Sequence, residues 1–244
     1  NLGFAKGVNE AARHASGKYL LLLNPDTVVK DRALDKIYEF AEAHPEYGFY
    51  GGRTLKPDGS LEPSSCWGSP SLWSLTAFAF GLSTVFKRNK WLDPESLGGW
   101  QRDTVREVGV ITGCLLLVEK TAWQKLRGFD ERYFMYGEDA DLAERARRQG
   151  FKPVIFPGAQ VIHEVGMSSK TPIHKMRLLY RGKATYARTH WRGISQSLAL
   201  FLLALGVALR AFPAKLTGKA DNRWLTLWGE RKIWLQGYNP LHSA

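Results

Sequence analysis

The residues with the best prospects for chemistry are polar side chains at the ends of strongly patterned segments. They are Asn24, Asp26, Glu138, Asp139 and His163. A carboxylate can accept a proton or bind a hard divalent cation, and a neutral imidazole is a common metal ligand. The sequence therefore offers the groups needed for general-base catalysis and for a metal site that binds phosphate.

Asp26 follows an apolar run at 18–23, whose length predicts a strand buried on both faces, as in a parallel sheet. In open α/β sheets, ligands bind beyond the carboxyl ends of the strands. Asp26, with Asn24 beside it, could therefore hold a cation against a phosphate. A simple Asn-Pro-Asp turn explains the same residues, and the spacing alone favours that turn.

Glu138 and Asp139 begin a predicted helix that ends in basic residues before Gly150. Because a helix N-terminus stabilises a carboxylate, we expect Asp139 to stay ionised and able to take a proton. First-turn acids are also ordinary partners of the helix dipole, and Asp141 could simply cap or pair. His163 ends a predicted strand and is, taken alone, more typical of an ordinary hydrogen-bonded residue than of a metal ligand.

The elements that would position these residues alternate between strand and helix, which predicts an α/β fold. We expect helices at 7–16, 33–41, 121–126 and 138–149, and strands at 18–23, 48–51, 108–118, 153–156 and 159–163. Gly113 lies inside one strand, where glycine indicates close approach of a ligand or another backbone. Residues 63–106 carry aromatic residues without periodicity. They favour an insertion packed on its own aromatics over a lid that contacts substrate.

Composition limits the remaining possibilities. The 244 residues are 44% apolar and 23% charged, which excludes wholesale disorder. Cys66 and Cys114 have no metal-binding spacing, which argues against a zinc site or a disulfide scaffold and favours a reducing compartment. The net charge of +11 lies entirely in residues 170–244, which hold 13 Lys and Arg against Asp221 and Glu230. We therefore predict a domain at 1–169 and a basic helical tail at 170–244.

The tail contains 12 apolar residues at 198–209, fewer than the ~20 that a membrane-spanning helix needs. Tryptophans and cations flank this run, which suits a membrane interface with anionic lipid. A helix docked on the first domain, or in a dimer, explains the run equally well. The basic charge also leaves open a nucleic-acid-binding protein, although the chain has no recognised nucleic-acid motif.

Four segments taken together resemble the inverting nucleotide-sugar glycosyltransferases of family 2, and most closely their rhamnosyltransferase-like branch. They are residues 1–9, 19–26, 113–142 and 161–169. The resemblance implies a GT-A-like sheet that binds a nucleotide sugar, and transfer of a hexose with inversion. It also implies an N-terminally incomplete chain, because the family's first strand–helix–strand units precede these motifs. An inactive fragment of a transferase is therefore a further alternative.

The resemblance also implies roles for individual residues. Asp139 takes the place of the catalytic base, with Glu138 beside it, while Asp26 and His163 would hold Mg²⁺ or Mn²⁺. The substrate-binding candidates are Asn24, Gly113 and Asp141, the last in a position that is more structural in character. The sequence departs from the family at Glu119-Lys120 and Arg127-Gly128, which obscures the identity of acceptor and sugar.

The partners implied by the resemblance are a nucleoside-diphosphate sugar, with dTDP-rhamnose as the leading donor, and a lipid-linked or saccharide acceptor. They point to biosynthesis of a cell-wall polysaccharide. The expected location is the cytoplasm, peripheral at the inner face of the cytoplasmic membrane.

Overall fold

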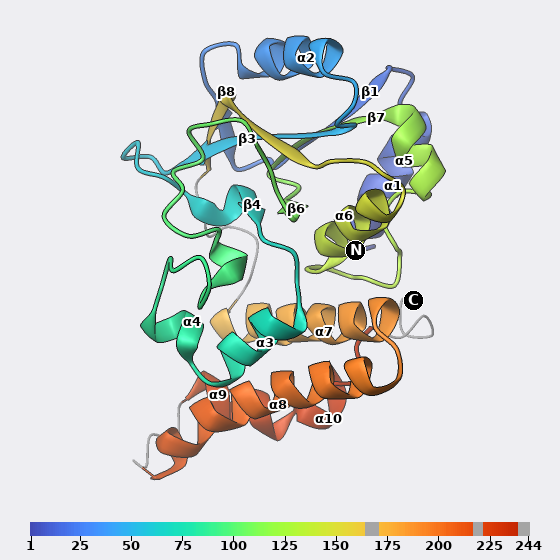
Figure 1. The fold of residues 1–244 in the computed structure, drawn as a ribbon. Coiled ribbons are helices and arrows are strands. Elements are labelled where there is room, and N and C mark those ends of the chain that lie inside the picture. The colour runs from blue at the N-terminus through green and yellow to red at the C-terminus, as the bar shows by residue number, and fades with distance from the viewer. Residues whose placement is uncertain (164–170, 217–221, 239–244) are drawn as a thin grey trace.

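The computed structural model describes residues 1–163, 171–216 and 222–238, and its elements are stacked in layers (Figure 1). A central sheet has helices on both faces, which confirms the α/β class. Helix α2 (Ala33–Ala43) covers the upper face of the sheet in Figure 1. The helices packed on the lower face are α1 (Phe4–His14), α5 (Lys120–Leu126) and α6 (Glu138–Arg148).

The sheet has six strands and is mixed in direction. In the part of the chain that the structure describes, its path runs β1-β7-β3-β8-β2, with β5 paired to β8; the β3–β8 pair is parallel and the other pairs are antiparallel. The strands are β1 (Tyr19–Leu23), β2 (Thr27–Val29), β3 (Phe49–Leu55), β5 (Arg106–Glu107), β7 (Leu115–Glu119) and β8 (Val154–His163).

Strand β1 does not have the environment predicted for it. It lies at an edge of the sheet and pairs antiparallel with β7, whereas the sequence predicted a strand buried on both faces. Leu20 and Leu22 are buried, but Leu21 and Leu23 are exposed. The reason is that α2 packs on β3 and β8, away from this edge, so one face of β1 meets solvent.

Strand β7 is covered on both faces and carries the centre of the core. Leu115 and Leu117 pack in a cluster with Ile37 of α2, whereas Leu116 and Val118 pack in the cluster shared with α1, α5 and α6. This period-2 alternation is what a central strand with helices on both sides requires.

The strand predicted at 108–118 is broken in the middle. Its first part, β6 (Val110–Ile111), pairs with β4 (Cys66–Trp67) in a separate two-stranded sheet, and β7 begins at Leu115. Gly113 lies in the break, where an added Cβ would come 2.8 Å from the ring of Phe4. The two strands predicted at 153–163, by contrast, form the single strand β8, whose register with β3 shifts at Gly52/Arg53.

Residues 63–106 contain two helices that the sequence did not predict, α3 (Leu72–Ala79) and α4 (Leu82–Val85). Helix α3 packs on the carboxyl-terminal helices, where Phe78 lies against Gly206 and Arg210. The segment was predicted to pack on its own aromatics, and within it the Trp73 ring N–H donates to the Trp91 carbonyl oxygen (2.6 Å). Its packing on the carboxyl-terminal helices was not predicted.

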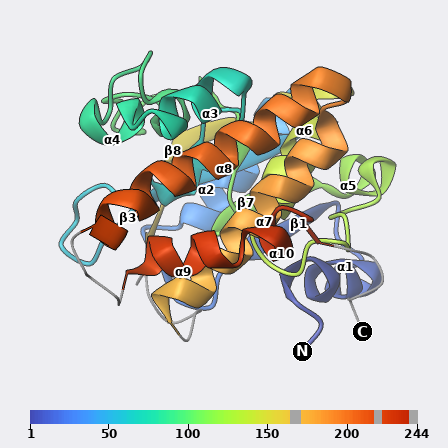
Figure 2. The same cartoon turned by 90° about the horizontal axis from the view of Figure 1, so that it is seen from below.

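The helices after residue 170 form a layer below the sheet domain (Figures 1 and 2). They are α7 (Pro172–His190), α8 (Gly193–Leu216), α9 (Arg223–Gly229) and α10 (Arg231–Trp234). Helix α8 is longer than the apolar run that predicted it. Its stretch Gly193–Pro213 is long and apolar enough to cross a membrane, judged by length and composition alone, and one third of it is buried.

Candidate active site

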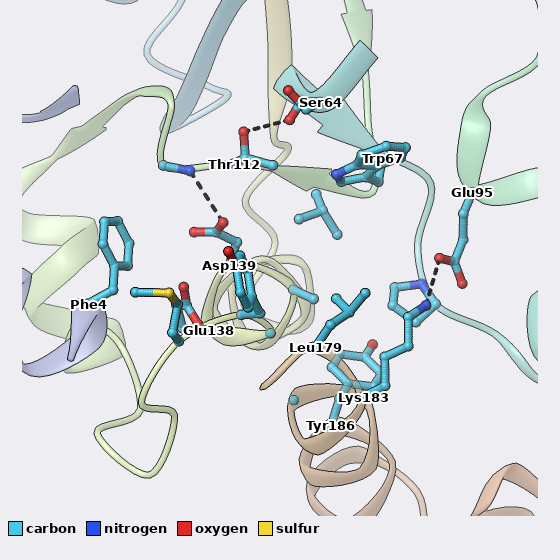
Figure 3. Close-up of a pocket in the computed structure, with 18 of the residues that line it drawn as sticks. Phe4, Ser64, Trp67, Glu95, Thr112, Glu138, Asp139, Leu179, Lys183 and Tyr186 are labelled. Atoms are coloured by element: carbon cyan, nitrogen blue, oxygen red, sulfur yellow. Dashed lines mark hydrogen bonds and ion pairs between the residues drawn. The ribbon is translucent and has the colours of Figure 1, made fainter. Parts of the chain in front are cut away.

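A cavity of about 570 Å³ lies between the sheet domain and helix α7 (Figure 3). Six of the seven residues singled out in the sequence line it, although they come from four separate parts of the chain. They are Asn24, Asp26, Gly113, Glu138, Asp139 and His163. The fold therefore gathers the predicted site residues around one volume.

The pairing of β2 with β8 brings Asp26 to His163. Thr27 lies opposite His163 in this antiparallel pair, and Asp26 precedes it by one residue. The His163 Nε2 lies 3.2 Å from the Asp26 Oδ1, and both side chains are largely buried. Strand β2 was not predicted, and it is the element that creates this proximity.

The Asn-Pro-Asp turn predicted at 24–26 is present, and it lies at the cavity. The Asn24 N–H donates to the Cys114 carbonyl oxygen (3.2 Å), and the Thr27 hydroxyl donates to the Asn24 carbonyl oxygen (2.6 Å). The Asn-Pro-Asp turn is thereby fixed at the end of the sheet, with Asp26 facing the cavity.

Asp26 and His163 each have a buried polar atom that could bind a metal. The Asp26 Oδ1 contacts the His163 Nε2, but among the described residues neither the Asp26 Oδ1 nor the His163 Nδ1 has a hydrogen-bond partner. No group of three or more His, Cys, Asp or Glu side chains in the described part of the chain could hold a metal. Mg²⁺ is commonly held by one or two carboxylates together with substrate phosphates and water, so two protein ligands fit such a cation.

Asp139 is held by the strand break described above. The Gly113 N–H donates to the Asp139 Oδ2 (3.3 Å), while the Asp139 Oδ1 has no partner among the described residues (Figure 3). Gly137, with φ 105°, begins the helix, and an added Cβ there would come 2.9 Å from the Tyr133 ring. This glycine allows α6 to start beside the cavity wall.

The pKa values of Glu138 and Asp139 are both raised. Burial raises the pKa of Asp139 well above its ordinary range, and the neighbouring Glu138 charge raises it further. Burial also raises the pKa of Glu138. Burial therefore acts on Asp139 in the opposite direction to the helix N-terminus, which was expected to favour the ionised carboxylate. A helix dipole supplies ~0.3–1 kcal/mol at a surface, while burying an ion costs several kcal/mol.

Asp141 lies outside the cavity and is fully buried. Its carboxylate pairs with the Arg145 guanidinium (2.7 Å) and with the His190 Nε2 (2.7 Å). His190 is the last residue of α7, so this carboxylate connects α6 to α7. The geometry gives Asp141 a structural position rather than a place against substrate.

Helix α7 contributes cavity residues that the sequence analysis assigned only to the tail. Lys175, Leu179, Gly182 and Tyr186 recur every three or four residues on one face, and Lys183 follows Gly182. The Lys183 Nζ lies 3.3 Å from the Glu95 Oε2, which comes from the 63–106 segment (Figure 3). Trp67 from the same segment also lines the cavity, as the alternative of a substrate-contacting lid requires.

Comparison with known families gives two matches. Residues 1–95 match the model of glycosyl transferase family 2, and residues 105–170 match a model described as the N-terminal domain of galactosyltransferase.

Curated relatives are similar over the same region. A rhamnosyltransferase from Mycobacterium tuberculosis, named for N-acetylglucosaminyl-diphospho-decaprenol, is 31% identical over 188 residues, which are 69% of this chain and 58% of the relative. Rhamnosyltransferase WbbL of Escherichia coli K12 is 31% identical over 158 residues, 64% of this chain and 56% of the relative. The chain thus spans less than three fifths of the length of these relatives.

Two solved structures are also similar. One is a GalNAc-T7 structure with UDP, GalNAc and Mn²⁺, 13% identical with a TM-score of 0.46, covering 82% of this chain and 40% of that one. The other is a Pyrobaculum calidifontis mannosyltransferase with GDP-Man and Mn²⁺, 16% identical with a TM-score of 0.46, covering 96% and 63%.

The family matches and the relatives place this α/β chain among the glycosyltransferases. It belongs to glycosyl transferase family 2 and is rhamnosyltransferase-like. The resemblance inferred from the four sequence segments is thereby confirmed.

Proposed function

We propose that this chain transfers a hexose from a nucleoside-diphosphate sugar to an acceptor hydroxyl, with inversion at the anomeric carbon. The observation that carries the proposal is the convergence of six separately predicted residues on one cavity. The names of the relatives support rhamnose as the sugar, so dTDP-rhamnose is the leading donor. One relative is named for a diphospho-decaprenol acceptor, which supports a lipid-linked or polysaccharide acceptor for this chain as well.

In the proposed reaction, Asp139 is the base that takes the acceptor hydroxyl proton. The free Oδ1 receives the proton as the acceptor oxygen bonds to the anomeric carbon, on the face opposite the leaving group. The bond from that carbon to the diphosphate oxygen breaks, and the nucleoside diphosphate leaves. The Gly113 N–H holds the Oδ2 and so orients the Oδ1. Burial, and after it the Glu138 charge, keeps the proton affinity of Asp139 high.

Asp26 and His163 are the residues that would hold Mg²⁺ or Mn²⁺. Their orphaned ligand atoms and their position on the cavity support this assignment. When bound, the cation would offset the negative charge that grows on the departing diphosphate. Asn24 is next to this pair and lines the same cavity, so we assign it to donor binding.

We further infer that the protein works in the cytoplasm at the inner face of the cytoplasmic membrane, where a lipid-linked acceptor would be found. Cys66 and Cys114 are both free and buried, which is compatible with a reducing compartment.

The test of the base is Asp139→Asn. The amide preserves the shape and cannot accept the proton, so turnover should fall by about 10²–10⁴-fold while donor binding stays within a few-fold. Donor hydrolysis or transfer gives the first quantity, and nucleotide-sugar titration gives the second. The matched control is Glu144→Gln, a carboxylate later in the same helix that does not line the cavity. Near-normal turnover in Asp139→Asn would refute the role.

A further inference from the structure

Helix α8 has two faces with opposite environments. On one face Ala199, Leu203 and Val207 are fully or almost fully buried in the cluster shared with α3, α7 and α9. On the other face large apolar side chains are exposed along the whole helix. They are Ile194, Leu198, Phe201, Leu209 and Phe212. We call this second set the outer stripe of α8.

The outer stripe is continuous and uncharged. Its members are spaced by four, three, eight and three residues, which places them on one side of an α-helix. The exposed fractions reach 87% at Ile194, 60% at Phe201 and 62% at Phe212. The helix has no charged residue before Arg210. Such a stripe needs a partner in water, because large exposed apolar patches mark interaction surfaces.

A membrane-spanning orientation conflicts with the packing of the opposite face. Helix α8 is held against α3, where Gly206 approaches the ring of Phe78 so closely that an added Cβ would lie 2.3 Å away. The Arg210 guanidinium also lies over the Phe78 ring at 4.2 Å. Lipid can surround α8 on all sides only if these contacts are broken, so the helix can offer a membrane only its outer stripe.

A second copy of the chain is a poor match for the size of the stripe. A helix face 18 residues long extends ~27 Å, and at a width of ~10 Å its area is ~270 Å². A stable protein interface buries about 800 Å² on each partner. The stripe alone falls well below that area, whereas a lipid surface sets no such minimum.

The charge near α8 complements an anionic surface. Exposed cations occur at its start and in the helices that follow it, namely Arg192, Arg223 and Lys232. Within residues 171–216 and 222–238 the one acidic residue is Glu230, and it is paired with Arg177 (Nε–Oε2 2.6 Å). Basic residues near an anionic bilayer are attracted to it, so these cations favour the same orientation as the stripe.

We propose that α8 lies parallel to an anionic membrane surface, with its outer stripe in the acyl region and its opposite face packed on the protein. This deepens the membrane location given under the proposed function, and it specifies the contact side chains and the orientation. In Figure 1, α8 lies below α7 together with α9 and α10. The stripe-bearing helix is therefore part of the outermost layer on this side, and α7 with the cavity residues comes next.

The test measures binding of the 244-residue chain to phosphatidylcholine vesicles with and without phosphatidylglycerol, by flotation at low salt. The intact chain should bind the vesicles that contain phosphatidylglycerol. The double variant Phe201→Asp/Phe212→Asp should bind them at least tenfold more weakly. The matched control is Tyr38→Asp, which adds a charge at an exposed aromatic of α2, at the far end of the molecule. It should bind like the intact chain.

A fluorophore reports the depth of the helix. Because Cys66 and Cys114 are buried, a thiol-reactive dye should label an introduced Phe201→Cys selectively. Lipids brominated near the headgroup should quench this label more than lipids brominated near the chain end. Stronger quenching by the deeper bromines would mean insertion and would overturn the parallel orientation.

Other outcomes also decide the proposal. Equal vesicle binding by the double variant, or no binding by the intact chain, overturns it. A dimer in sedimentation equilibrium that the double variant dissociates, without vesicle binding, assigns the stripe to a second copy instead. Ile194→Asp changes the most exposed residue of the stripe and so should leave the fold intact. It should also weaken vesicle binding, which separates loss of the stripe from a folding defect in the double variant. Donor titration without vesicles tests the proposed transferase function separately, so either idea can fail alone.

Discussion

Glu138 and Asp139, the two acidic residues at the start of α6, have carboxyl groups that are shielded from solvent. Glu138 is 4% exposed, and its Oε2 has no partner among the described residues. The raised pKa of Asp139 means that its carboxylate binds a proton more strongly than an ordinary aspartate does, as a general base requires. The same burial opposes folding, because the folded chain must ionise groups that the unfolded chain keeps in water.

Replacing Glu138 should therefore stabilise the protein at alkaline pH. The raised pKa means that the folded chain binds more protons than the unfolded chain once the pH exceeds the ordinary value of about 4.3. The free energy of unfolding therefore falls as the pH rises from the ordinary pKa of Glu138 toward its raised pKa in the folded chain. Glu138→Gln should raise the Tm at pH ~8 by a few degrees, since about 1 kcal/mol shifts Tm by ~2–4 °C at this chain length.

At pH ~3, well below the ordinary pKa of about 4.3, both states carry a protonated Glu138, so the same substitution should have little effect. Thermal unfolding at the two pH values measures the difference, with Glu39→Gln on the exposed side of α2 as the control. A Tm gain of equal size at both pH values would show that the charge of Glu138 is not its cause.

Asp26 and His163 should bind a divalent cation together with the donor. Asp26→Ala should weaken binding of Mn²⁺ in the presence of a nucleoside diphosphate by at least tenfold, because it removes one of two protein ligands. Electron paramagnetic resonance of free Mn²⁺ measures this without any turnover. Asp58→Ala, an acid in the Lys56–Ser60 turn outside the cavity, should leave it unchanged.

Chelation extends the same prediction to activity. EDTA should abolish transfer, and added Mg²⁺ or Mn²⁺ should restore it. Full transfer in EDTA would contradict the assignment of both residues.

At the scale of elements, the position of α7 depends on two contacts with the region around α6. The buried Asp141 carboxylate joins Arg145 of α6 to His190 at the end of α7. Gly182 lies so close to the Tyr136 carbonyl that an added Cβ would be 2.0 Å from its oxygen. These contacts bring Lys183 and Tyr186 to the cavity wall.

Asp141→Ala should destabilise the fold rather than act on catalysis alone. Removing one partner of a buried ion pair leaves an uncompensated charge and typically costs ~3–5 kcal/mol. Urea unfolding should show a loss of that size, whereas Asp35→Ala, at an exposed surface pair with Arg32, should cost less than ~1 kcal/mol. If the Asp141→Ala variant is stable but does not bind donor, the structural role is wrong and Asp141 acts in substrate binding.

The sequence predicted what local pattern encodes and missed what packing creates. Helix α6 and strand β1 follow from periodicity and from Gly and Pro signals, and the residues at their ends were identified as site candidates. Strand β2 has three residues and leaves almost no pattern in the sequence. Its pairing of Thr27 with His163 nevertheless brings Asp26, the residue before Thr27, to His163. Lys183 could not be assigned because its place in the cavity depends on the Asp141–His190 contact across 49 residues.

At the scale of the whole molecule, the neutral and basic parts of the chain share a core. Leu75 and Ala79 of α3 are buried in one cluster with Leu203 and Trp234 of the later helices. The cavity is likewise walled by α7 on one side and by residues before 164 on the other. The change in charge at residue 170 is therefore not a boundary in packing.

Deletion of residues 170–244 should consequently damage the catalytic part. It would expose the buried side of α3 and remove one wall of the cavity. We expect the truncated chain to aggregate or to lose donor binding, as seen by size-exclusion chromatography, circular dichroism and donor titration. A soluble monomer with unchanged donor affinity would contradict this view and support two independent units.

The link between β1 and β2 has a consequence for how related chains can vary in length. These strands lie at opposite ends of the sheet path, yet only residues 24–26 separate them. The link forms a turn that is fixed by the Thr27–Asn24 hydrogen bond and places Asp26 at the cavity. A change in the length of this link would move Asp26, whereas the exposed Lys56–Ser60 turn lies outside the cavity. Related chains should therefore differ in length at the Lys56–Ser60 turn rather than beside Asp26.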